Sequence, residues 1–335
     1  MRANVAERLL QHYVDNFRTL PWRSPPGEPP PDPYRVWLSE VMLQQTTVAA
    51  VAPRFERFIR RWPTVQDLAT AADEEVLSEW AGLGYYARAR NLIACAREVA
   101  RRGGFPDTEA ELRKLPGIGD YTAAAIAAIA FGRRAVVIDS NVERVAARLT
   151  ALEQPTRAEL RQVVDAITPE TRSGDFAQAM MDLGATICRP RQPLCGECPL
   201  RSGCKAFASG QPERFPAPKV CAAKPIRYGV AHWIEREGAV WLVRRPARGL
   251  LGGMMALPGP EWGGEAAEVP GSAVTIVRHV FTHFELRLTI IAGAATIGEG
   301  WWQPIGSMAD AGLPTLYRRA VDAVLAARQE QRRAA

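Results

Sequence analysis

The chain has 335 residues, a length typical of two domains, and its 47% hydrophobic and 23% charged residues exclude a largely disordered protein. The formal net charge of +6 is compatible with a polyanionic partner but does not establish one. Apolar stretches fall short of the roughly 18–20 residues of a membrane span, and the N-terminal residues lack a secretory signal's apolar core, so we expect a cytoplasmic protein.

Helical patterns fill the first 205 residues of the chain. Apolar residues recur there at helical spacing, loops with Gly, Pro, Asp or Thr separate the segments, and no strand alternation of any length is present. The expected helices span residues 5–17, 34–52, 55–61, 74–80, 87–102, 109–115, 121–131, 141–149, 157–167 and 175–187. We therefore predict an all-helical domain at residues 1–205.

The composition changes after this domain. Residues 206–226 contain several prolines and no apolar periodicity, which is typical of a linker. Strand patterns follow at residues 228–235, 239–244, 274–280, 285–292 and 301–304, and a last helix is expected at 316–328. The prediction is a mainly α protein with a smaller α+β domain at residues 227–331.

A group of cysteines lies at the end of the helical part. Its spacing is C-x6-C-x2-C-x5-C, formed by Cys188, Cys195, Cys198 and Cys204. Four thiolates in one short loop can bind either zinc or an iron–sulfur cluster. Only one CxxC pair is present, and the wider flanking spacings favour a [4Fe–4S] cluster. Cys95 and Cys221 are isolated, and we expect them in the core and in the linker.

Residues 115–122 join two helical patterns through a proline and two glycines, Gly117 and Gly119. A glycine-rich turn at a helix N-terminus offers backbone amides to a phosphate, although an isolated Gly-x-Gly is more simply a tight turn between helices. The flanking residues are typical of a helix–hairpin–helix element. Such an element would hold a DNA backbone without reading its sequence.

Two carboxyl groups are candidates for acid–base chemistry. Asp139 ends an apolar run before a helix, and taken alone it is more simply a helix N-cap. Glu40 lies on a helical pattern one turn from Trp37 and Leu43. A solvent-facing glutamate is the simple alternative, but these neighbours predict a half-buried carboxyl with the raised pKa that an acid catalyst needs.

Taken together and in order, these segments resemble the adenine DNA glycosylases of the MutY type, within the helix–hairpin–helix superfamily that includes endonuclease III. The resemblance covers nearly the whole chain. Its markers are Leu-Pro-Trp-Arg at residues 20–23, WLSEVMLQQT at 37–46, GLGYYARARN at 82–91, LPGIGDYTA at 115–123, VIDSNVERV at 137–145, FAQAMMDLGATIC at 176–188 and the cysteine loop.

The resemblance assigns roles by position. It makes Glu40 the catalytic acid, makes Asp139 the group that stabilises the sugar cation, and places Tyr121 where lyase relatives carry a lysine. A monofunctional enzyme with little or no lyase activity is implied, as is one [4Fe–4S] cluster on the four cysteines. The remaining implied sites are an adenine pocket at Trp22, Arg23, Leu43 and Gln178, DNA intercalation by Gln45 and Tyr85, and DNA backbone binding at Gly117 and Gly119.

The C-terminal part resembles the Nudix-fold domain of the same enzymes. Phe281, Thr282 and His283 match the loop that recognises 8-oxoguanine, with Thr282 in place of the usual serine. Glutamates at 261, 265 and 268 are scattered among glycines and alanines, so we expect a binding module without pyrophosphatase activity. Ser140 replaces the glycine usual after the catalytic aspartate, which requires a local backbone that tolerates a Cβ.

The implied function is excision of adenine mispaired with 8-oxoguanine or guanine, the first step of base excision repair. The implied partner is double-stranded DNA carrying such mispairs, bound by a monomer in the bacterial cytoplasm, at the nucleoid, without a membrane. A thymine glycosylase or an endonuclease III-like lyase is the alternative among enzymes. A DNA-bound iron–sulfur protein that senses redox state without catalysis is the alternative of another class.

Overall fold

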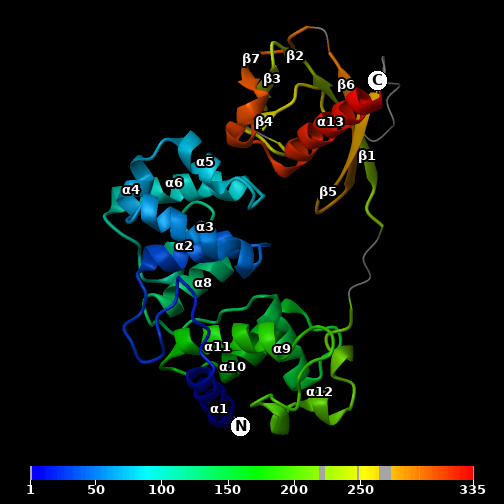
Figure 1. The fold of residues 1–335 in the computed structure, drawn as a ribbon. Coiled ribbons are helices and arrows are strands. Elements are labelled where there is room, and N and C mark those ends of the chain that lie inside the picture. The colour runs from blue at the N-terminus through cyan, green and yellow to red at the C-terminus, as the bar shows by residue number, and fades with distance from the viewer. Residues whose placement is uncertain (1, 219–222, 247–248, 264–272, 294, 335) are drawn as a thin grey trace. The chain divides into compact units, whose positions relative to one another are not determined.

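The computed structural model describes residues 2–218, 223–246, 249–263, 273–293 and 295–334. The chain divides into two compact units, one made of Met1–Ala71 with Arg90–Val220 and the other of Ala72–Ala89 with Cys221–Ala335. Figure 1 labels the elements of both. The predicted fold class, a helical part followed by a smaller part containing strands, is confirmed. Of the predicted linker, residues 219–222 with Cys221 lie outside the described residues.

The first unit consists of helices in its described part (Figure 1). These are α1 (Arg2–Asp15), α2 (Pro33–Leu43), α3 (Val48–Arg61), α4 (Val65–Thr70), most of α6 (Ala87–Arg102), α7 (Glu109–Leu112), α8 (Asp120–Ile129), α9 (Ser140–Thr150), α10 (Arg157–Ile167), α11 (Ser173–Thr186) and α12 (Lys205–Ala208). Helix α5 (Asp73–Trp80) belongs to the second unit. Helices α4 and α12 were not predicted because each is little more than one turn long.

The prediction of a single helix over residues 34–52 is wrong, because α2 ends at Leu43 and α3 begins at Val48. Gln45 adopts a left-handed backbone with a φ of 55°, which a continuing α-helix does not allow. Thr47 then caps α3, and its side chain accepts a hydrogen bond from the amide of Ala50. The break leaves Gln45 on a short turn between two helices rather than on a helix face.

Close packing of α11 against α8 and α9 forms the centre of the first unit. A Cβ on Gly174 would lie 2.4 Å from the carbonyl oxygen of Ala128, and one on Gly184 would lie 2.6 Å from the Cβ of Asn141. Only glycine permits this approach of the backbones. Apolar residues from α1, α9, α10 and α11 fill the adjoining core, among them Leu9, Tyr13, Val142, Val145, Leu160, Val164, Phe176, Met180 and Leu183.

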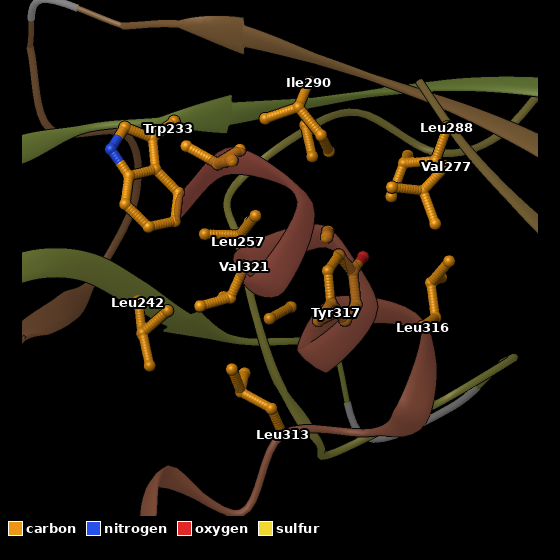
Figure 2. Packing of buried hydrophobic residues seen from close by; sticks show 14 of the residues in the cluster. Trp233, Leu242, Leu257, Val277, Leu288, Ile290, Leu313, Leu316, Tyr317 and Val321 are labelled. Atoms are coloured by element: carbon orange, nitrogen blue, oxygen red, sulfur yellow. The ribbon is translucent and has the colours of Figure 1, made fainter. Parts of the chain in front are cut away.

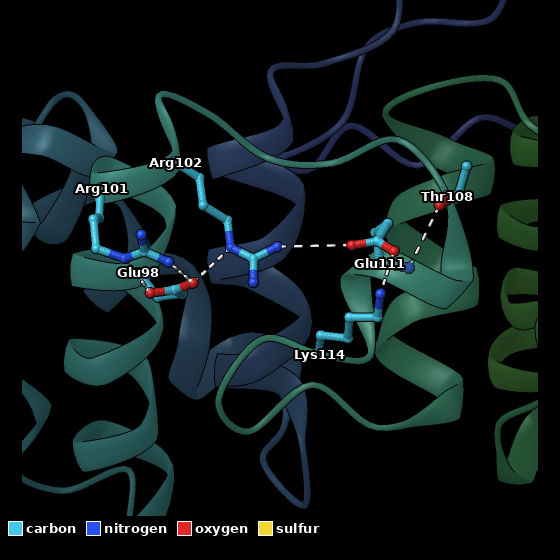
Figure 3. Close-up of polar contacts among 6 residues, drawn as sticks. All are labelled: Glu98, Arg101, Arg102, Thr108, Glu111 and Lys114. Carbon is cyan, nitrogen blue, oxygen red and sulfur yellow. Dashed lines mark hydrogen bonds and ion pairs between the residues drawn. The ribbon is translucent and has the colours of Figure 1, made fainter.

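A charged network connects α6 with α7, the helix that precedes the glycine-rich turn (Figure 3). Glu98 accepts hydrogen bonds from Arg101 and Arg102, which lower its pKa to about 2. Arg102 lies 3.8 Å from Glu111 of α7, and Glu111 also pairs with Lys114. Exposed pairs of this kind contribute little stability individually.

The described part of the second unit contains two sheets. In one, β6 (Glu285–Ala292) lies between β1 (Ile226–Trp233), which runs parallel to it, and β5 (Ala273–Val280), which runs antiparallel. In the other, β3 (Ala239–Arg244) pairs antiparallel with β2 (Glu235–Arg236), β4 (Met255–Ala256) and β7 (Gly300–Pro304). The strand predictions are confirmed to within two residues at each end, and among the strands of the described residues the two-residue β2 and β4 were missed.

Helix α13 (Thr315–Ala334) packs its apolar face onto the strands of this unit (Figure 2). Leu316, Tyr317 and Val321 from the helix meet Leu288 and Ile290 of β6 in one buried cluster. Alternation along β6 explains this packing, because every second residue from Leu286 to Ile290 is fully buried. Within the described residues of the chain, no helix combines the length and apolar character that a membrane crossing requires.

Candidate active site and cysteine loop

A cavity of about 780 Å³ opens in the first unit between α2, α8, α9 and α11. Most of the site residues predicted in this part of the chain contribute to its wall: Trp22, Arg23, Glu40, Leu43, Gln45, Gly117, Gly119, Tyr121, Asp139 and Gln178. Five widely separated segments therefore supply one site. The wall also contains residues that were not predicted, including Arg18, Gln44, Asn141, Met181 and Asp182.

Glu40 projects from α2 into this cavity and is only 7% exposed, more deeply buried than the sequence suggested. Burial raises the pKa of its carboxyl to about 7, and the hydrogen bond from Tyr121 opposes that rise. The Tyr121 hydroxyl donates to Oε2 of Glu40 over 2.8 Å. Because Oε2 already accepts the hydrogen bond from Tyr121, Oε1 is the oxygen suited to carry the acidic proton.

Tyr121 lies in the first turn of α8, directly after the glycine-rich turn. Burial, with the nearby Glu40 carboxyl as the next contribution, raises the pKa of its hydroxyl well above the ordinary value. The hydroxyl is therefore a permanent proton donor near neutral pH and fixes the orientation of Glu40. It also lies 3.4 Å from the sulfur of Met181.

Asp139 is both a helix cap and a cavity residue. Its Oδ1 accepts from the amide of Val142 over 2.7 Å, which caps α9, and its Oδ2 accepts from Nδ2 of Asn141 over 2.9 Å. The N-terminus of a helix favours a negative charge, and the two donors hold the carboxylate in one orientation. The N-cap interpretation and the catalytic interpretation of this residue thus describe the same geometry. Ser140, which follows, starts α9 with ordinary helical backbone.

Asp182 of α11 is a site residue that the sequence analysis missed. It is 8% exposed and accepts a two-pronged ion pair from Arg23, at 2.6 and 3.0 Å, and a third contact from Arg18 at 3.0 Å. This pairing fixes the Arg23 guanidinium at the cavity wall. Asp182 follows Gln178 by one helical turn, so the helical period could have revealed that both side chains face the cavity.

Arg144 of α9 connects the cavity wall with the cysteine loop. Its Nη2 donates to Oδ1 of Asn141 over 2.9 Å and to the carbonyl of Gly184 over 2.7 Å, and its Nε donates to the carbonyl of Cys188 over 2.8 Å. Asn141 in turn donates to Asp139. The orientation of Asp139 therefore depends on α9, on α11 and on the first residue of the cysteine loop.

The turn that precedes α8 packs against α6. Gly117 has a φ of 73°, and a Cβ there would lie 2.6 Å from the Cβ of Asn91 on α6. Gly119 occupies the N-cap position of α8 without a side-chain cap, so backbone amides of the first helical turn are left for another acceptor. Both glycines lie on the cavity wall, as expected for a turn that approaches a ligand closely.

The predicted recognition loop lies in the second unit. Thr282 and His283 are exposed, whereas Phe281 is half-buried in an aromatic cluster with His279, Phe284 and Trp262, at ring distances of 4.6, 4.9 and 5.7 Å. Tyr85 belongs to the same unit, has a φ of 48° and is 48% exposed. Its hydroxyl shares a 2.7 Å hydrogen bond with that of Thr282. Of the scattered glutamates, Glu261 is exposed, and those at 265 and 268 lie outside the described residues.

The four cysteines after α11 form no disulfide, and their donor chemistry suits an iron–sulfur cluster. Burial raises the thiol pKa of Cys198 to about 11 and raises those of Cys195 and Cys204, with smaller contributions from neighbouring thiols of the same loop. The thiols are thus near enough to interact electrostatically. Within the described residues, no three His, Cys, Asp or Glu side chains are arranged to hold a single metal ion.

The helical fold, the glycine-rich turn and the cavity with its two carboxyl groups define a helix–hairpin–helix protein of DNA base excision repair. The family described as HhH-GPD superfamily base excision DNA repair protein matches residues 38–170, and the NUDIX domain family matches residues 229–323. A thermostable thymine-DNA glycosylase superposes with a TM-score of 0.56 at 28% identity, over 62% of this chain and 97% of the other. Endonuclease III in a non-covalent complex with DNA gives 0.53 at 25% identity, over 62% and 95%.

Sequence relatives identify the family. An adenine DNA glycosylase of Rattus norvegicus is 35% identical over 83% of this chain and 68% of its own length. Another, of Arabidopsis thaliana, is 39% identical over 75% of this chain, which spans only 46% of that relative. The chain belongs to the adenine DNA glycosylase family, as the sequence motifs predicted. Enzymes of the endonuclease III and MutY type generally carry a [4Fe–4S] cluster.

Proposed function

We propose that this protein is a monofunctional adenine DNA glycosylase that removes adenine mispaired with 8-oxoguanine or guanine and so initiates base excision repair. The observation that carries the proposal is the buried Glu40, with a pKa of about 7, on the same cavity wall as the capped carboxylate of Asp139. Cleavage of an N-glycosidic bond needs two carboxyl groups in different protonation states, one as acid and one facing a sugar cation.

The proposed substrate enters the cavity as a flipped nucleotide, which costs a few kcal/mol of stacking and pairing. Gln45, on the turn after α2, and the exposed Tyr85 are the proposed wedges that fill the gap in the duplex. Trp22, Arg23, Leu43 and Gln178 would contact the extruded adenine, and the glycine-rich turn at residues 117–119 would hold the backbone phosphates. The DNA-bound endonuclease III structure supports duplex DNA as the partner.

In the proposed reaction, Glu40 donates its proton to N7 of adenine, and the bond between N9 and C1′ breaks with its electron pair moving onto the base. Positive charge then develops on the sugar, where the ionised Asp139 stabilises it. Water adds to C1′ and loses a proton to a carboxylate, which completes hydrolysis. Tyr121 keeps the Glu40 carboxyl oriented, and Asp182 keeps Arg23 at the cavity wall.

We further propose that the enzyme has little or no lyase activity. A lyase needs an amine that attacks C1′ and forms a Schiff base. Tyr121 lies where such relatives carry a lysine, and none of the described residues lining the cavity is a lysine. The neighbouring Lys114 pairs with Glu111 outside the cavity wall (Figure 3).

Cys188, Cys195, Cys198 and Cys204 are proposed to bind one [4Fe–4S] cluster, which would serve as a structural cross-link of the loop after α11. The second unit is proposed to recognise 8-oxoguanine through Phe281, Thr282 and His283. The ring of Phe281 packs on Phe284, and the polar side chains of Thr282 and His283 are exposed. It would be a binding module without pyrophosphatase activity. We propose a monomer acting in the bacterial cytoplasm, at the nucleoid.

The first test is single-turnover cleavage of a duplex with adenine opposite 8-oxoguanine, analysed with and without alkali. Strand scission at adenine only after alkali is the expected result, because a monofunctional enzyme leaves an intact abasic strand. Duplexes with thymine mispairs or oxidised pyrimidines are the matched comparison. Cleavage of those duplexes, or scission without alkali, would instead place the chain with the thymine enzymes or with endonuclease III. DNA binding without any base loss would favour the redox-sensing alternative.

The excision rate should depend on pH through Glu40. With a pKa of about 7, its protonated fraction falls about tenfold for each pH unit well above that value, and the single-turnover rate constant should fall in parallel. The rate is measured from mildly acidic to alkaline pH, with duplex binding followed at each pH as the control. A rate that stays constant into the alkaline range would contradict the assignment of Glu40 as the acid.

Replacing Gly184 by alanine should slow excision although residue 184 carries no side chain of its own in the site. The added methyl would lie 2.6 Å from the Cβ of Asn141, so α9 or α11 must shift and Asn141 must move relative to Asp139. Small displacements of a catalytic group cost about 10- to 100-fold in rate. Gly306→Ala is the control, because a Cβ at Gly306 meets no atom within 4 Å. Equal rates for the two variants would contradict the prediction.

A further inference from the structure

Arg148, near the C-terminal end of α9, is a buried charge that has no carboxylate among its hydrogen-bond partners within the described residues. It is 3% exposed, and its guanidinium donates to the carbonyls of Phe215, Arg189 and Pro190 at 2.9, 2.7 and 3.0 Å. The remaining contact joins its Nη1 to the sulfur of Cys188 over 3.4 Å. All of these acceptors are neutral except the sulfur, which carries a negative charge once it is a metal-bound thiolate.

A buried guanidinium needs a compensating negative charge. Arginine does not lose its proton in proteins, and removing an unpaired charge from water carries a large free-energy penalty. Backbone carbonyls solvate the group but bring no net charge. The cysteine loop is the one source of negative charge in direct contact with Arg148 among its described partners. The same residue also lies beside the other end of the loop, because its carbonyl oxygen is 3.4 Å from the sulfur of Cys204.

We propose that Arg148 is the buried counter-charge of the cluster bound by the cysteine loop, and that it holds the Cys188 sulfur and the following backbone through one guanidinium fork. This inference rests on the proposed cofactor. Arg148 is a positioning residue, since it touches a ligand of the cluster and no reacting atom of the DNA. A positive charge at this position stabilises the more reduced, more negative state of the cluster and therefore raises its reduction potential.

Other basic residues near the loop differ from Arg148 in burial or in partner. Arg191 lies between Cys188 and Cys195 but is exposed, so water and salt screen its charge. Arg144 reaches the carbonyl of Cys188 rather than its sulfur. Burial and direct contact with sulfur make Arg148 the basic residue whose charge should act most strongly on the cluster.

The test compares the full-length wild-type protein with R148Q, R148K and R191Q. Cluster content is measured from the visible absorbance together with iron and sulfide analysis, and the midpoint potential is measured by voltammetry with the electrode as electron donor and acceptor. We expect R148Q to shift the oxidation equilibrium at least about tenfold toward the oxidised cluster, a fall of about 59 mV for one electron. R148K should stay close to wild type, because it keeps the charge, and R191Q should be unchanged.

Each outcome bears on the proposal. An R148Q protein that loses its cluster while R148K retains it supports the need for the charge. Equal cluster loss in R148Q and R148K, or a loaded R148Q with the wild-type potential, overturns it, because the guanidinium would then act only as a structural fork. A shift in R191Q as large as that in R148Q also overturns it. Wild-type protein without iron and sulfide would refute the cofactor proposal itself, a result distinct from all of these.

Discussion

Replacing Glu40 by glutamine should slow adenine excision by orders of magnitude while leaving duplex binding intact. The amide has nearly the shape of the protonated carboxyl and can still accept the hydrogen bond from Tyr121, but it has no acidic proton for the base. Loss of a general acid costs about 10²–10⁴-fold in rate. Single-turnover excision and equilibrium binding to the same mispaired duplex are measured side by side, with Glu143→Gln as the matched substitution. Glu143 lies on α9 and does not contribute to the cavity wall.

The same variant should be more stable than wild type at alkaline pH. Because the pKa of Glu40 is about 7 in the folded protein against an ordinary 4.5, folding opposes its ionisation, and wild-type stability falls as pH rises between these values. Residue 40 does not ionise in E40Q, so the free energy of unfolding of this variant should exceed that of the wild type by up to about 3 kcal/mol above pH 7. Near pH 4 the two should be equal. Denaturant unfolding at the two pH values measures this difference. Activity retained in E40Q, or stability equal to wild type at both pH values, would show that Glu40 is not a buried acid.

The sequence predicts the helices and strands well because their apolar periodicity is strong. The ranges expected for α6, α10, β3 and β6 agree with the structure at both ends. The error over residues 34–52 has a local cause. Apolar residues continue at helical spacing past Leu43, but the left-handed backbone of Gln45 ends one helix and Thr47 caps the next. Backbone conformation at a single polar residue is not encoded in periodicity, and this residue is the proposed wedge.

The candidate site was predictable only where a motif carried it. Periodicity alone leaves Glu40 half-buried and Asp139 a helix cap, because burial to 7% and a shared cavity depend on segments far apart in the sequence. The helical period from Gln178 could have placed Asp182 on the cavity face, but not its ion pairs, because Arg18 and Arg23 precede it by 164 and 159 residues. The sulfur contact of Arg148 was equally hidden, since a basic residue on a helix is more simply a surface residue.

Replacing Asp139 by asparagine should lower the excision rate about 10²–10³-fold, the usual effect of removing one group that stabilises transition-state charge. Asparagine is as good an N-cap as aspartate, so its oxygen can still accept from Val142 and α9 should remain capped. The substitution removes the negative charge that faces the sugar cation. Excision is measured under single-turnover conditions, and unfolding is measured in parallel.

Two further variants separate the roles that Asp139 combines, and a third is their control. D139A removes the cap as well as the charge, so it should lose about 1 kcal/mol of stability that D139N keeps. N141A removes the 2.9 Å hydrogen bond to Oδ2 but leaves the charge, and it should therefore slow excision less than D139N does. D175N is the control, because Asp175 pairs with Arg172 in the first turn of α11 and does not line the cavity. If N141A and D139N lose equal activity, orientation of the carboxylate rather than its charge limits the reaction; if D139N keeps wild-type activity, the cation must be stabilised by another group.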